Sequence, residues 1–312
     1  MPAQMTSAQA RVIDPILTNV ARGYQNNELV GGALFPTIPV GKRGGKIIVF
    51  DKTSFKLFAT DRSPGENVRR VRFGRQSDPY SLTQHALEGE VAVEDLEESQ
   101  DGPGIDEAFT AVSGVANIIA LRKERAQAAL ATNAALYPVS NKVTLTLTDQ
   151  WSDPASTPVN DIEAAKDAIR SKTGKRPNTL VLGPTVFSAL KTNPQIIDRI
   201  KYTGRDVPTL DLLASLFGVA NVVSGDAVQA SDDDVLSDVW GKFAVLAFTQ
   251  VADLRARGVP SFGYTYQLKN YPIAKPGYYE ENTNTWYYQV MDECSPVIAG
   301  SDAGFLFSGA VA

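Results

Sequence analysis

The chain has 312 residues, of which 43% are hydrophobic and 21% charged, with a mean hydropathy of −0.14 and a net charge of −5. This composition is typical of a folded globular protein and excludes a largely disordered chain and a bundle of membrane spans. Because acidic residues outnumber basic ones, the composition disfavours a protein whose main activity is to bind the phosphates of nucleic acid. Because the length slightly exceeds what one hydrophobic core usually supports, we expect two packed subdomains.

Residues 1–43 are expected to form an arm. Residues 11–24 fit a short amphipathic helix, whereas residues 29–40 hold two prolines and two glycines, which predict irregular structure. Leu34 and Phe35 in that segment still require burial. The arm therefore packs either on its own body or on a neighbouring subunit.

Residues 44–80 predict a long two-stranded excursion. Extended patterns at 46–50 and 80–82 flank a turn-rich stretch at 60–67. An isolated hairpin of this length is marginal in water, so we expect it to lie against another surface.

The charges of this excursion and of the next segment are opposite. Residues 41–80 have a net charge of +6, from four acids and ten bases: Lys42, Arg43, Lys46, Lys52, Lys56, Arg62, Arg69, Arg70, Arg72 and Arg75. Residues 81–108 hold no base and nine acids: Glu88, Glu90, Glu94, Asp95, Glu97, Glu98, Asp101, Asp106 and Glu107. The two blocks could neutralise each other within one chain, or steer the basic loop of one subunit onto the acidic flank of the next. A solvated basic loop is the third possibility.

A single long helix is predicted over residues 105–137. Apolar residues recur there at three- and four-residue spacing, Gly104 precedes it, and the Tyr137-Pro138 step ends it. At a rise of 1.5 Å per residue the helix would be a rod of about 50 Å. We interpret it as a structural spine.

The rest of the chain alternates between strands and helices and then becomes β-rich. Strands are expected at 142–147, 179–183, 220–224 and 240–249, and helices at 160–174, from 184 onward and at 210–217. Aromatic strands follow at 262–266 and 285–290, and the last strands at 296–299 and 305–307.

Catalytic and metal-binding patterns are weak. Cys294 and His85 are the sole cysteine and histidine, which excludes disulfide frameworks and typical structural zinc sites. No Gly-x-Ser-x-Gly motif lies near His85, which we interpret as a surface or strand-face imidazole. We expect no catalytic residue, cofactor or metal.

Other candidate motifs also fail. The glycine-rich stretches 41–46 and 173–176 lack the Gly-Lys-Ser/Thr ending of a phosphate-binding loop. The acidic run 232–234 lacks the spaced ligands of a calcium loop. The carboxylates at 88–101 show no sign of a cleft, and the aromatic strands at 262–290 favour core or interface packing over base stacking.

The order of these elements resembles that of the major capsid proteins of tailed bacteriophages, whose fold is shared with encapsulin shells and the herpesvirus capsid floor. The N-terminal region is the most similar to the phage proteins. Its matching stretches are Asp14-Pro15-Ile16-Leu17-Thr18-Asn19-Val20-Ala21, Gly23-Tyr24, Leu34-Phe35-Pro36, Pro39-Val40 and Gly45-Lys46. The resemblance covers nearly all of the chain and depends on the order of weak motifs.

The resemblance implies an α+β fold with four parts. These are an N-terminal arm (1–43), an extended β-hairpin loop (44–80), a peripheral domain with the spine helix 105–137 (81–148 and 241–290), and an α/β axial domain (149–240 and 291–312).

It also implies a function. The chain would be a structural protein and not an enzyme, assembling with copies of itself as hexamers and pentamers into an icosahedral shell around double-stranded DNA. It would contact that DNA only non-specifically and would not associate with a membrane. Scaffold, portal and decoration proteins are implied partners, the scaffold being separately encoded or absent. The shell would be assembled in the host cytoplasm and become the virion capsid, which agrees with the lack of a signal-peptide pattern in residues 1–10.

Contacts between subunits are expected to involve basic loop residues, acidic flank residues and the apolar arm. The candidates are Lys46, Lys52, Lys56, Arg62, Arg69, Arg70, Arg72, Glu90, Glu94, Glu97, Glu98, Leu34 and Phe35. Some relatives join subunits by a lysine–asparagine bond, for which Lys46, Lys52 or Lys56 and Asn270, Asn282 or Asn284 lie in suitable regions.

Other functions remain open. An encapsulin-type shell around protein cargo is the alternative within the same fold. A cytosolic hydrolase that uses the carboxylates at 88–101 and a monomeric binding module are the alternatives from other classes.

Overall fold

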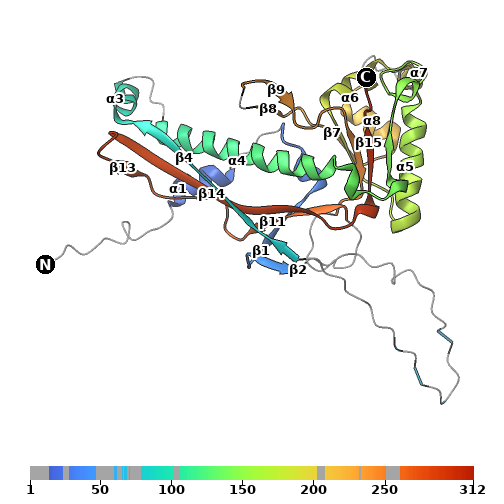
Figure 1. Ribbon diagram of the computed structural model, residues 1–312, viewed down its shortest axis with the longest axis horizontal. Helices are drawn as coiled ribbons and strands as arrows, with labels where there is room; N and C mark the ends of the chain where they lie inside the picture. Colours follow the sequence, from blue (N-terminus) through green and yellow to red (C-terminus); the bar gives the residue numbers. More distant parts are fainter. Residues whose placement is uncertain are drawn as a thin grey trace.

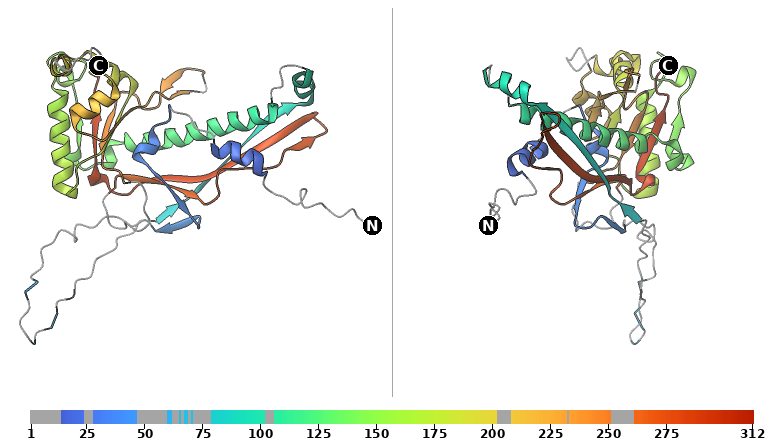
Figure 2. Two further views of the ribbon diagram at one scale, coloured as in Figure 1. Left: turned by 180° about the vertical axis from the view of Figure 1, so that it is seen from behind. Right: turned by 60° about the vertical axis from the view of Figure 1, so that its left-hand side comes forward.

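The computed structural model describes residues 14–23, 28–46, 60–61, 65, 67–68, 70, 79–101, 106–201, 208–231, 233–250 and 261–312. Two sheets dominate this part of the chain: a long open one and a compact five-stranded one (Figure 1). One long helix runs along the first sheet and ends beside the second (Figures 1 and 2). The α+β class predicted from the sequence is confirmed.

The long sheet is built around β14 (Thr285–Ile298), which has hydrogen-bonded strands on both sides. Along one edge it pairs antiparallel with β4 (Thr83–Ala92) over the whole length of β4. Its other edge carries β11 (Gly263–Leu268), β12 (Ile273–Ala274) and β13 (Tyr278–Glu280) in succession. One central strand therefore holds together segments from both halves of the chain.

The arm is more regular than predicted. Residues 29–40, expected to be irregular, contain α2 (Gly31–Leu34) and β1 (Thr37–Val40), which lies parallel to β11. Pro39 is tolerated in β1 because this strand pairs on one side only and forms the edge of the sheet. The predicted amphipathic helix is present as α1 (Pro15–Gly23), which packs against the long helix and β12.

The spine helix is shorter than predicted. α4 (Glu107–Ala131) begins after Asp106, whose carboxylate accepts a hydrogen bond from the Phe109 backbone at 3.1 Å. It ends before Asn133, whose side chain hydrogen-bonds to the Ala135 backbone and opens a separate 3-10 turn (Ala134–Leu136). Such local bonds of asparagine compete with helix continuation. The expected 105–137 rod is thus a helix of about 38 Å, and Gly104 and Ile105 lie outside the described residues.

The compact sheet has the strand order β5-β15-β10-β6-β7. Its strands are β5 (Lys142–Thr144), β15 (Gly304–Ser308), β10 (Ala244–Ala247), β6 (Thr179–Leu182) and β7 (Asn221–Ser224). A core of apolar side chains joins it to α5 (Pro158–Thr173), α6 (Pro184–Thr192), α7 (Pro194–Ile200) and α8 (Leu210–Phe217). The helix expected at 160–174 begins earlier, at Pro158, because proline favours the first helical position.

Three strands pair differently from the division into peripheral and axial parts expected from the sequence. Residues 142–144 of β5, expected in the peripheral part, pair with β15 of the compact sheet. β10 pairs with β6 and β15, so residues 244–247 belong to the compact sheet and not to the peripheral part. β14 continues without interruption past residue 290 to Ile298, so the long sheet includes residues assigned above to the axial part. These three differences arise from strand pairing, which the linear order of the elements does not reveal.

A hairpin of β8 (Val228–Ala230) and β9 (Leu236–Asp238) follows β7 and projects away from the compact sheet (Figure 1). Its two strands pair only with each other.

The long and compact parts meet at Glu124 of α4, which is 2% exposed. Its carboxylate accepts hydrogen bonds from the backbone of Val30 (2.9 Å) and Gly31 (2.8 Å) and from the indole of Trp240 (2.7 Å). Burial raises the pKa of this carboxyl above its ordinary value, and the three donors oppose that rise. Gly31 is required here, because a β-carbon would stand 2.2 Å from the Gln127 side chain.

Candidate subunit interface

The base of the basic loop is held on the long sheet by backbone pairing and by stacked rings. β2 (Gly44–Lys46) pairs antiparallel with β3 (Pro79–Ser81). The Tyr80 ring stacks on Tyr266 of β11, with ring centroids 4.6 Å apart and planes at 12°. The two ends of the loop therefore leave the body side by side from a fixed position.

An ion pair also holds the start of the basic loop in place on the long sheet. Arg43 donates two hydrogen bonds to Glu293 of β14, Nε to Oε2 at 2.7 Å and Nη2 to Oε1 at 2.9 Å. The Glu293 side chain is only 2% exposed, whereas that of Arg43 is 71% exposed. The bond from Arg43 and a second one from the Tyr271 hydroxyl hold the pKa of Glu293 below its ordinary value. The sequence analysis missed this pair, because nothing in the sequence brings residues 250 positions apart together.

Few of the predicted basic contact residues fall in the described part of the chain. Lys46 is exposed at the end of β2, and Arg70 is also exposed. The remaining candidates lie outside the described residues: Lys52, Lys56, Arg62, Arg69 and Arg72.

The predicted acidic candidates gather at the far end of β4. Glu90 is exposed on that strand, and α3 (Val93–Asp101) follows it with exposed Glu94 and Glu97. Glu98 lies in the same helix. Together, Glu88, Glu90, Glu94 and Glu97 form a surface that we call the acidic end.

Residues from β13 and from the β13–β14 turn complete the acidic end. Asn284 and the aromatic strands were considered above as possible contacts between subunits, but the sequence did not place them beside the acidic residues. The Asn284 amide donates to the Glu94 carboxylate at 2.9 Å, and the Tyr278 hydroxyl donates to Glu88 at 3.2 Å. Hydrogen bonds from its own backbone and from Asn284 lower the pKa of Glu94. Tyr278 and Tyr279 are 49% and 41% exposed, so large aromatic surfaces lie beside the carboxylates.

The acidic end and the loop base lie at opposite ends of β4 (Figures 1 and 2). β3 directly precedes β4, whose ten residues span about 33 Å at 3.3 Å per residue. Exposed charges interact over roughly 8–10 Å at physiological salt. Neutralisation within one chain, the first possibility considered above, therefore does not hold between Lys46 and the acids at Glu90, Glu94 and Glu97.

The apolar arm candidates are interior residues. Leu34 and Phe35 are both 0% exposed and pack with Tyr137 and Phe262 where the two sheets meet. The arm thus rests on its own body at this point, and these two side chains offer no surface to a neighbour. The three candidate asparagines are separated: Asn270 lies in the turn between β11 and β12, whereas Asn282 and Asn284 lie in the β13–β14 turn beside the acidic end.

Among the described residues, no constellation suits catalysis. His85 is half-buried on β4, and burial lowers its pKa. Cys294 is buried, and burial raises the pKa of its thiol to about 12, which disfavours the reactive thiolate. No group of three or more candidate ligands for a metal ion occurs in the part of the chain that the structure describes. None of its described helices is both long and apolar enough to cross a membrane.

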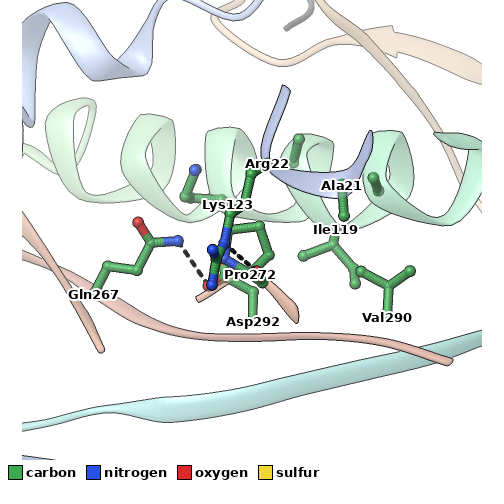
Figure 3. Close-up of a pocket in the computed structure, with 10 residues that line it drawn as sticks. Ala21, Arg22, Ile119, Lys123, Gln267, Pro272, Val290 and Asp292 are labelled. Carbon is green, nitrogen blue, oxygen red and sulfur yellow. Dashed lines mark hydrogen bonds between the residues drawn. The ribbon is translucent and has the colours of Figure 1, made fainter. Parts of the chain in front are cut away.

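A cavity of about 190 Å³ lies between α1, α4 and the long sheet (Figure 3). Arg22 and Lys123 line it beside Asp292, whose carboxylate accepts a hydrogen bond from Gln267 at 2.7 Å. Arg22 in turn donates to the carbonyl oxygens of Pro272 (3.0 Å) and Asn270. Arg22 thus fastens α1 to the turn between β11 and β12, and Asp292 is held by Gln267 within the sheet.

The other rejected motifs are turns and element ends. Residues 41–43 form a bend before β2, and Gly174 ends α5 in the left-handed conformation. Asp233 and Asp234 are exposed in the β8–β9 turn, and Asp232 lies outside the described residues.

Comparisons with known proteins agree with this architecture. Residues 136–223 match the family model described as phage major capsid protein E. The chain is 36% identical to the major capsid protein of Burkholderia phage BcepMu over 306 residues, which cover 97% of this chain and 98% of that protein.

The fold is also similar to that of solved structures. A phage-related protein of Bordetella bronchiseptica has a TM-score of 0.83 and 39% identity, covering 97% of this chain and 99% of the other. An encapsulin of Synechococcus elongatus shares the fold alone, with a TM-score of 0.52 and 16% identity, covering 99% of this chain and 92% of the other. Because it is 36% identical to a phage major capsid protein along 97% of its length, the chain belongs to the family of phage major capsid proteins.

Proposed function

We propose that the chain assembles with copies of itself, as hexamers and pentamers, into an icosahedral shell that encloses double-stranded DNA. The observation that carries this proposal is the identity of 36% along 97% of the chain to a phage major capsid protein. The protein acts structurally and not as an enzyme, and its negative net charge of −5 disfavours tight binding of the packaged DNA. Scaffold, portal and decoration proteins are its further partners, and assembly takes place in the host cytoplasm.

The geometry supports a specific contact between subunits. In our proposal the basic loop 44–80 of one subunit lies across the acidic end of the next. Two features favour this: the loop base is fixed by Arg43 and Glu293, and Glu90, Glu94 and Glu97 are too distant from Lys46 to be neutralised by it. Complementary charge on separate ends of a subunit directs encounter and register more than it adds affinity. Many modest contacts of this kind close a stable cage.

The test is purification of the chain, alone and with the products of neighbouring genes, followed by particle mass and negative-stain imaging. Closed particles of megadalton mass are expected, and nucleic acid inside them would distinguish a capsid from an encapsulin-type shell, which would contain protein. A species near the monomer mass of 33.6 kDa under every condition would overturn the proposal.

A deletion tests the loop contact separately. Removal of residues 60–72 leaves β2 and β3 in place and should give folded subunits that form no closed shells. Closed shells of the deleted chain would show that the loop does not bridge subunits.

A further inference from the structure

The β8–β9 hairpin carries an acidic and apolar surface that the described part of its own chain leaves uncovered. Val228, Val235 and Leu236 are 47%, 62% and 70% exposed. Val228 faces Asp238 across the two strands, and Ala230 faces Leu236, so these four side chains share one face of the hairpin. A two-stranded hairpin is marginally stable in water without a surface to lie on.

The charge of this segment has one sign. Residues 226–238, which we call the acidic hairpin, hold no base and five acids: Asp226, Asp232, Asp233, Asp234 and Asp238. Of these, the described four are exposed. The partner of this hairpin should therefore present an apolar centre flanked by positive charge.

The outer face of α4 has that composition. Ile118, Arg122, Arg125 and Ala129 follow four-, three- and four-residue spacing, which aligns them along one side of the helix. All four are exposed, Ile118 by 55%, whereas Ala116 and Gln127 on the opposite side of the helix are buried. We call these four residues the basic helix face.

The two surfaces match in chemistry, and the exposure of both shows that neither covers the other within one chain. The hairpin projects from the compact sheet, and the basic helix face extends over about three turns of α4, so one can lie on the other between two molecules.

We propose that the acidic hairpin of one subunit docks on the basic helix face of a second copy of this chain. The contact places Leu236 and Val228 against Ile118, with the hairpin aspartates beside Arg122 and Arg125. It rests on the proposed shell function, and it uses surfaces separate from the basic loop and the acidic end. Opposite charge around an apolar centre fixes the register between the two copies.

Charge reversal on each side tests the contact. The first variant carries Arg122→Glu and Arg125→Glu, the second Asp233→Lys and Asp234→Lys, and the third all four changes. A control with Lys175→Glu and Arg176→Glu alters two exposed charges at the end of α5. The measurement is the fraction of protein in closed particles by sedimentation, with circular dichroism of each subunit.

We expect each one-sided reversal to lower the particle fraction at least about tenfold, because like charges then face each other. In the variant with all four substitutions, the fraction of protein in closed particles should return to within about threefold of the wild-type fraction. The control should assemble normally. Normal assembly of both one-sided variants overturns the contact while leaving the shell function intact. The same conclusion follows if the variant with all four substitutions folds but forms no more closed particles than either one-sided variant. Failure of the wild type to assemble under any condition overturns the shell function and this contact with it.

If a charge-reversal variant fails to fold, disulfide cross-linking between two cysteine variants tests the contact instead. Shells assembled from a mixture of Ile118→Cys and Leu236→Cys subunits are oxidised and run on a denaturing gel. Buried Cys294 does not compete. A covalent dimer that forms in the mixture, and in neither variant alone, supports the contact; its absence from mixed shells overturns it.

Discussion

The two sheets of this protein differ in how completely they are buried. In the compact sheet, β6 and β10 are buried at each of their four positions, with four helices packed on the sheet. In the long sheet, β4 is buried only at Val91 among its ten residues. Because burial of apolar surface is the main source of stability, we infer that the compact sheet contributes most to the stability of the fold, and we propose that the long sheet serves as a platform for contacts between subunits. The same substitution should therefore have different effects in the two regions.

A matched pair of leucines gives the largest expected difference. Leu246 in β10 is 0% exposed, and Leu246→Ala should lower the free energy of unfolding by about 3 kcal/mol, since it leaves a cavity. Leu87 in β4 is 40% exposed, and Leu87→Ala should lower it by less than about 1 kcal/mol. Urea unfolding of unassembled subunits measures both. Equal losses would contradict the division of roles between the sheets.

The junction between the two regions should give the next largest effect. Glu124→Ala removes the acceptor of two buried donors, from Gly31 and Trp240, and of a half-buried one from Val30, and should cost about 2 kcal/mol of unfolding free energy. Arg125→Ala, on the exposed side of the same helix, is the control.

The pH dependence of this loss has a definite sign. The folded-state pKa of Glu124 is raised, so the folded protein holds this proton more tightly than the unfolded chain does. The contribution of this carboxyl therefore falls as pH rises from its ordinary pKa of 4.5 through the raised value. The difference in free energy of unfolding between wild type and Glu124→Ala should be larger at about pH 5 than at about pH 8. A difference that grows as pH rises would show that the three hydrogen-bond donors lower the pKa of Glu124 by more than burial raises it.

The loop base should show a smaller effect with the opposite pH dependence. Arg43→Gln removes the partner that lowers the pKa of Glu293. The stability gained from that pair is present above the ordinary carboxyl pKa of 4.5 and is lost as pH falls through the lower folded value. The stability difference between wild type and Arg43→Gln should therefore shrink on acidification. Solvent screens the exposed guanidinium, which keeps the effect modest. Lys42→Gln is the control. If acidification left the stability difference between wild type and Arg43→Gln unchanged, Arg43 would not be the group that lowers the pKa of Glu293.

The sequence predicted the parts of the fold that local pattern determines. Alternating strands and helices of the compact part, the amphipathic α1 and most of α4 follow from apolar spacing and turn residues. Long-range pairing was not predictable in this way. The position of β10 between β6 and β15 and the continuous β14 depend on contacts between distant segments, and so does the pair of Arg43 with Glu293.

The candidate interface was predictable only as two blocks of charge. Counting residues located the acidic block along the chain, but it predicted neither the helix α3 that carries part of this block nor the bonds by which Tyr278 and Asn284 complete that surface. Leu34 and Phe35 were misjudged as possible contacts for a related reason. An apolar residue in a segment rich in proline and glycine needs burial, and the sequence does not say whether its own chain provides that burial.

The smallest effect on subunit stability is expected at the acidic end, where the effect on assembly should be large. Glu94→Lys with Glu97→Lys should change the free energy of unfolding by no more than about 0.5–1 kcal/mol, since both side chains are exposed. The same variant should reduce closed particles at least about tenfold if the basic loop of a neighbour lies there. Asp167→Lys with Asp198→Lys, two exposed acids of the compact part, is the matched control and should assemble normally. A variant that loses stability and assembly in parallel would mean that the long sheet supports the fold of its own subunit. Loss of assembly alone is the outcome that separates a platform for neighbours from a structural core.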